Sequence, residues 1–210
     1  MPSAETPKPQ LSLLFPDSYA DQDVAAVLAE FALPEDAIRV RKVERGSFAA
    51  LEWSMPTVFM ATLSGLYLKA LMTEAAKDHY PKIVAGLKAL AARCRKMQIR
   101  WLNAEQIRHG LMPKYQQSAG FSIVVQTKSG QLVKLLFDQA LSQAAWEDAI
   151  DAFLMLALLN QQKAPDDDIT AAANALKTTH NGMLYVVWSR EREQWEFEDD
   201  KSMMAKSRNS

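Results

Sequence analysis

The sequence predicts an α+β domain with a mainly antiparallel sheet built from hairpins, a buried central helix and several packing helices. Two segments, 121–137 and 184–197, each contain a pair of strands with alternating apolar residues around a short polar loop, which is typical of a β-hairpin. Pairs of helical segments lie between the predicted strands, and such separate runs of strands and helices favour this fold class. The chain has 210 residues, of which 49% are hydrophobic and 23% charged, and this fits one globular domain with a sizeable core.

Both ends of the chain are predicted to be flexible tails. Residues 1–10 hold three prolines, and residues 199–210 are polar without apolar periodicity. Residues 11–198 are therefore expected to form the single α+β domain, with a possible subdivision near 115–120.

The first elements alternate between strand and helix. Residues 11–15 predict a strand, and residues 21–33 predict a helix with one apolar face. Residues 38–43 and 48–53 predict a hairpin with Gly46 in its turn.

The most apolar segment, 56–76, predicts the buried central helix. No charged residue lies between Glu52 and Lys69, and this run falls short of the roughly 17 apolar residues that a membrane span requires at least. The few polar positions recur at helical spacing and form one narrow stripe on an otherwise apolar helix. We therefore expect a core helix and no membrane segment.

The middle of the chain predicts a helix, a strand and a shorter helix. Residues 81–97 carry an apolar seam with spacings of three and four residues, and Cys94 lies on this seam. We therefore expect Cys94 to be a structural core residue. A strand at 98–102 and a short helix within 103–113 are expected to follow.

The two later hairpins have a predicted register. In the first, a three-residue loop with Gly130 in the left-handed conformation sets apolar residues against each other. This register pairs Phe121 with Phe137, Ile123 with Leu135 and Val125 with Val133. In the second, a four-residue loop pairs Trp188 with Trp195 and Val186 with Phe197, and the reverse side is half polar, as on a sheet face open to water.

No cofactor and no metal site is expected from the sequence. The seven glycines are isolated, so a phosphate-binding loop is absent, and the three histidines lack the spacing of metal ligands. The aspartates at 166–168 fit the start of a helix at 166–179. Any of the three histidines could be a general base in a dispersed catalytic site, and His109 is the candidate singled out because it lies in a long connection between predicted strands.

Charge is unevenly distributed along the chain. Residues 37–137 contain 16 positively and five negatively charged residues, although the whole chain has a formal net charge of −1. This basic middle predicts an anion-binding or acidic-partner site, but no nucleic-acid-binding motif accompanies it. The candidate binding residues are Arg93, Lys96, Arg100, Arg108 and Lys114.

The helix predicted at 142–162 suggests an interface. Eight consecutive apolar residues, 152–159, would cover every side of two turns, and a helix that is apolar all round must be covered all round. We expect Phe153, Leu156 and Leu159, or their neighbours, to contact a second chain.

These observations favour a non-catalytic protein-interaction or regulatory module. The single cysteine and the lack of a signal peptide favour the cytoplasm. Two alternatives stay open: a binder of nucleic acid or another polyanion through the basic segment 82–114, and an enzyme with a dispersed site near His109.

Overall fold

The structure is a computed structural model, and it describes residues 11–43, 57–73, 76–96, 117–162, 167–176, 183–189, 191–199, 201–203 and 205. Its helices and strands, in chain order, are β1 (Leu11–Pro16), α1 (Asp21–Phe31), the 3₁₀ helix η1 (Glu35–Ala37), β2 (Ile38–Val43), β3 (Phe59–Leu63), α3 (Gly65–Leu71), α4 (His79–Lys96), β4 (Gln117–Gln126), β5 (Leu132–Asp138), α6 (Gln143–Gln161), α7 (Asp168–Leu176), β6 (Met183–Ser189) and β7 (Gln194–Glu198).

The strands form one mixed sheet, with the order β2-β1-β3-β4-β5-β6-β7 among the described residues. The neighbours β1–β2, β3–β4 and β5–β6 are parallel, whereas β1–β3, β4–β5 and β6–β7 are antiparallel. The prediction of an α+β fold is confirmed, but the prediction of a mainly antiparallel sheet built from hairpins is wrong. The reason is that helices connect parallel neighbours by crossovers, as in β1-α1-β2, and this cannot be read from hairpin patterns.

The predicted central helix at 56–76 is also wrong, because this segment contains a strand followed by a short helix. In β3, Phe59, Ala61 and Leu63 are buried on one side, and α3 begins directly after the strand. Ser64 ends the strand by capping the helix, since its hydroxyl oxygen accepts a hydrogen bond from the backbone N–H of Tyr67 at 3.2 Å. None of the helices described here combines the length and the hydropathy that a bilayer crossing requires.

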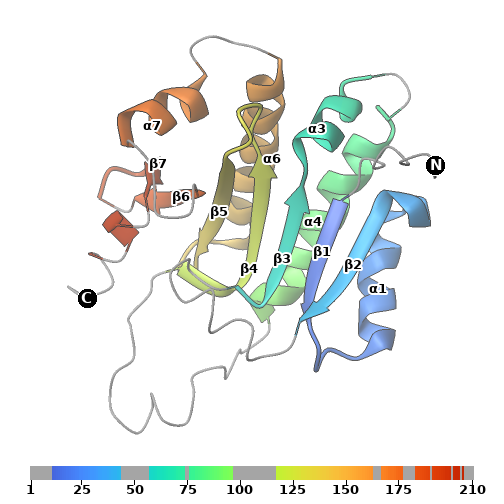
Figure 1. The fold of residues 1–210 in the computed structure, drawn as a ribbon. Helices are drawn as coiled ribbons and strands as arrows, with labels where there is room; N and C mark the ends of the chain where they lie inside the picture. The colour runs from blue at the N-terminus through green and yellow to red at the C-terminus, as the bar shows by residue number, and fades with distance from the viewer. Residues whose placement is uncertain are drawn as a thin grey trace, which may run out of the picture.

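Helices α1, α4 and α6 cover one face of the sheet, which we call the helix face (Figure 1). One row of paired side chains crosses this face from β1 to β6 and lies at the centre of the core: Leu13, Ala61, Ile123, Leu135 and Val186. The apolar seam predicted for α4 is confirmed, because its residues Ile83, Leu87 and Cys94 are buried against this face. Burial of the sheet row against the apolar seam of α4 provides much of the favourable free energy of folding.

The predicted hairpin registers agree with the structure. Val125 pairs with Val133, and Gly130 has a φ of 89°, so the loop takes the left-handed turn that the register required. Trp188 pairs with Trp195 across the second hairpin. The predicted elements at 48–53, 98–102 and 103–113 lie outside the described residues.

The opposite side of the sheet, which we call the second face, is buried over β4, β5 and β6. Leu136, Tyr185 and Val187 form a small apolar cluster with Met203, which belongs to the segment expected to be a tail. The prediction that the reverse side of the second hairpin is open to water is wrong, because Tyr185 and Val187 are 0% and 3% exposed.

Candidate functional site

Strand β2 is the most exposed strand of the sheet, and it lies at one edge of the described strand order. All six of its residues pair in register with β1 on one side. Four consecutive residues, from Arg39 to Lys42, are nevertheless exposed, and Val40 alone exposes 37% of its surface. Side chains pointing to both sides of β2 are therefore accessible, and a strand at the edge of a sheet also presents backbone N–H and C=O groups for pairing.

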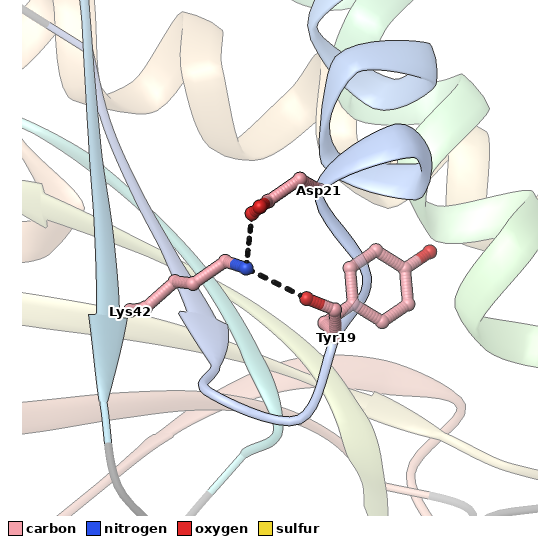
Figure 2. A network of polar contacts seen from close by, with 3 residues as sticks. All are labelled: Tyr19, Asp21 and Lys42. Carbon is pink, nitrogen blue, oxygen red and sulfur yellow. Dashed lines mark hydrogen bonds and ion pairs between the residues drawn. The ribbon is translucent and has the colours of Figure 1, made fainter.

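Lys42 fixes β2 to the beginning of α1. Its ammonium group donates a hydrogen bond to the backbone oxygen of Tyr19 at 2.8 Å and forms an ion pair with Asp21 (Figure 2). The hydrogen bond from Lys42, together with its positive charge, lowers the pKa of Asp21. The ring of Tyr19 stacks on Phe15 with 5.7 Å between the centroids, so the turn before α1 is held on both sides.

Arg39 and Arg41 point to the second face, where they continue two rows of half-buried side chains. One row runs from Arg39 through Ser12 on β1 to Thr62 on β3. The neighbouring row runs from Arg41 through Leu14 and Met60. Neither arginine forms an ion pair within the described part of the chain, so two exposed guanidinium groups border a mixed polar and apolar surface.

A row of buried polar side chains crosses the second face further along the sheet. Lys134 on β5 pairs with Tyr185 on β6, which in turn pairs with Glu198 on β7. Lys134 is 3% exposed, and burial lowers the pKa of its ammonium group to about 7. A neutral lysine amine can act as a base or a nucleophile, but this one is enclosed, and all three side chains take part in further interactions. The sequence signal for this row was a lysine within the apolar strand LVKLLF.

The basic residues predicted to bind an anion are only partly described. Arg93 on α4 forms an ion pair with Glu30 on α1 at 2.9 Å, which links two helices. Its neighbour Arg95 donates a hydrogen bond to the backbone oxygen of Leu141 at 2.6 Å, so both guanidinium groups have partners within the chain. Lys96 ends α4. Arg100, Arg108, His109 and Lys114 lie outside the described residues, so the predicted anion site and the candidate catalytic histidine stay predictions.

The residues predicted for an interface occupy different sides of α6. Phe153 is 3% exposed and faces the core, so it is not available at the surface, and Leu156 is half-buried. Leu159 exposes 43% of its surface, and Met155, which was not singled out by the sequence, exposes 52%. On the neighbouring helix α3, Leu66 exposes 61%. The exposed large apolar side chains of α6 are thus Met155 and Leu159.

The acidic run at 166–168 has a structural role in the part that is described. Burial opposes ionisation of Asp167, but hydrogen bonds from Thr170 and Asn160 outweigh it and hold the pKa below the ordinary value. The Asp167 carboxylate accepts a hydrogen bond from the backbone N–H of Thr170 at 3.0 Å and so caps α7. The described residues include no group of three or more side chains that could hold a metal ion.

His79 pairs with a buried tyrosine. The Tyr67 hydroxyl lies 3.3 Å from the Nδ1 atom of His79, and burial raises the pKa of Tyr67 to about 12. The phenol therefore stays protonated at neutral pH, which fits a hydrogen bond that joins α3 to α4 better than a pair that exchanges protons with a substrate.

Comparison of the chain with protein-family models, with curated proteins and with solved structures gave no match.

Proposed function

We propose that the protein is a non-catalytic protein-interaction module of the cytoplasm that self-associates through α6. The observation that carries this proposal is the exposed apolar surface of this helix. Met155 and Leu159 each leave about half of their surface accessible. Full burial of a methionine or leucine side chain contributes roughly 1.5–3 kcal/mol, so covering these two side chains would favour association.

The spacing of the exposed positions on α6 fits a contact with another helix. Ala152, Met155, Leu159 and Gln162 are exposed and follow one another at intervals of three, four and three residues, which places them on one side of the helix. Ala152 is small, so a second helix could approach closely at this point. None of the four side chains is charged.

A second copy of the chain is the partner that this surface favours. In a two-fold symmetric dimer the same patch meets itself, so an uncharged apolar stripe creates no electrostatic repulsion between the copies. Two antiparallel α6 helices would bring Met155 close to the symmetry axis and cover Leu159 with the partner helix.

Light scattering on the full-length protein tests this proposal. The wild type is expected to have the mass of a dimer, and the double variant Met155→Glu/Leu159→Glu the mass of a monomer with an unchanged helical circular dichroism spectrum. The matched control is Ala25→Glu/Ala29→Glu, which places the same two new charges at the same spacing on the exposed side of α1 and should leave the dimer intact. A wild-type protein that stays monomeric at every concentration, or a double variant that stays dimeric, would contradict the proposal.

A further inference from the structure

Strand β2, at the edge of the described strand order, is held by hydrogen bonds at both ends. At its beginning, the backbone N–H of Ile38 donates a hydrogen bond to the backbone oxygen of Glu35 in η1. At its end, the backbone oxygen of Val43 accepts a hydrogen bond from the N–H of Asp17 at 3.0 Å. Lys42 adds the link to α1 shown in Figure 2. Binding of a segment at this edge would therefore not require β2 itself to become ordered, and such preorganisation favours binding.

The charges of β2 alternate with the period of a strand. Arg39 and Arg41 point to the same side, and two residues that are two positions apart in a strand lie roughly 7 Å apart. An extended peptide beside β2 has the same repeat. Carboxylates at every second position of that peptide would therefore meet both guanidinium groups at once, and charged hydrogen bonds of this kind are stronger than neutral ones.

We propose that β2 is a docking strand for an extended acidic segment of another protein, which extends the sheet beyond β2 and places its carboxylates against Arg39 and Arg41. This surface lies on a different element from the α6 stripe and has a different partner. Leu14 and Met60 lie in the row of Arg41 but one and two strands farther from the added strand, so the contacts of that strand are with Arg39, Arg41 and the backbone of β2. Addition of a strand gives affinity through the main chain, and the alternating side chains give specificity.

Two other occupants fit this edge less well. In a second copy of β2, Arg39 and Arg41 would face arginines of like charge, which destabilises cross-strand pairing. Single-stranded nucleic acid binds to aromatic platforms, but the second-face side chains beside the two arginines are Ser12, Leu14, Met60 and Thr62.

Charged side chains on an edge strand can also serve only to prevent aggregation. In that case β2 would bind no strand of either charge. The two roles are therefore separated by binding measurements with designed peptides.

The test uses the full-length protein and a fluorescein-labelled peptide of alternating glutamate and valine, followed by fluorescence anisotropy. A peptide with lysine in place of glutamate, and a single-stranded oligonucleotide of equal charge, serve as comparisons. Two further glutamate peptides carry N-methyl groups on the odd-numbered or on the even-numbered residues. For either direction of the added strand only every second residue points its N–H toward β2, so each of these peptides can dock in one direction at most. A third peptide, N-methylated on every residue, should lose binding in both directions.

The protein variants separate β2 from the overall charge. Arg39→Glu/Arg41→Glu should weaken binding of the glutamate peptide roughly tenfold or more, and Arg39→Gln/Arg41→Gln should weaken it less. The control Lys69→Glu/Lys82→Glu makes the same change in net charge at exposed positions on α3 and α4 and should leave binding unchanged. Because all four replaced residues are exposed, the circular dichroism spectrum should not change.

Several results would overturn the proposal. They are no binding of the glutamate peptide, equal loss of binding in the control variant, undiminished binding of the fully N-methylated peptide, and binding of the oligonucleotide without binding of the peptide. The oligomeric state plays no part in these readouts, so they do not depend on dimerisation through α6.

Discussion

Lys134 provides the sharpest test of the second face. Because its ammonium group is almost completely shielded from water, burial lowers its pKa to about 7 from the ordinary lysine value of 10.5. This difference corresponds to a cost of about 5 kcal/mol for folding with a charged lysine, since each pKa unit is worth about 1.4 kcal/mol. The substitution Lys134→Met keeps most of the side-chain volume and removes the titrating group.

The sign of the pH dependence follows from proton binding. Between about pH 7 and pH 10.5 the unfolded chain keeps the proton on this lysine, whereas the folded protein has released it. The unfolded state therefore binds more protons in this window, and the free energy of unfolding must rise with pH. Between pH 7 and about pH 9 the rise from Lys134 alone should be roughly 2 kcal/mol.

Urea denaturation of wild type and Lys134→Met at a series of pH values measures this contribution. The stability of the wild type relative to Lys134→Met should rise by roughly 2 kcal/mol from pH 7 to about pH 9. Contacts of Lys134 that do not titrate shift one curve by a constant and leave its slope unchanged. The control Lys128→Met, at an exposed position of the same hairpin, should have the slope of the wild type. Parallel curves for wild type and Lys134→Met would refute a buried titrating amine.

Three further predictions concern the core. Cys94 is 2% exposed, so a thiol reagent should label it slowly in the native protein and quickly in denaturant; rapid native labelling would show that the register of α4 is wrong. In Gly86→Ala the new Cβ would lie 2.3 Å from Cδ1 of Phe31, so the helices must move apart at a cost of about 1–3 kcal/mol, and an unchanged urea midpoint would contradict this contact. Asn160→Ala removes a buried amide that donates to Asp167 at 3.0 Å and should cost about 1–3 kcal/mol, whereas thermal unfolding at the wild-type temperature would show that the network adds no stability.

The candidate sites differ in how far the sequence reveals them. The alternation of IRVRKV indicates a strand, but its position at the sheet edge, which exposes Arg39 and Arg41, depends on strand order. In α6 eight consecutive residues are apolar, so the sequence does not show which side of the helix faces outward. The sequence therefore suggested Phe153, which faces the core, and did not single out Met155, which is exposed. Which side of such a helix is exposed is decided by the elements packed against it.

What the sequence by itself determined is the local structure. Strand pairing in both hairpins followed from the alternation of apolar residues and the loop lengths, because neighbouring segments have few ways to pair. The helices at α1 and α4 followed from apolar residues at helical spacing, and the helix at α6 was predicted over 142–162. These signals act over a few residues and do not require knowledge of the rest of the chain.

Only the tertiary structure decided the rest. Strand β3 has apolar or partly buried residues on both of its sides, and apolar residues also precede and follow it. Its alternating pattern is therefore hard to recognise in the sequence, and the segment was predicted to be part of a helix. Parallel or antiparallel neighbours, the row of Lys134, Tyr185 and Glu198, and the exposed edge at β2 all depend on contacts between residues far apart in the chain. Such contacts are set by how whole layers bury their apolar faces, and no local spacing of residues encodes them.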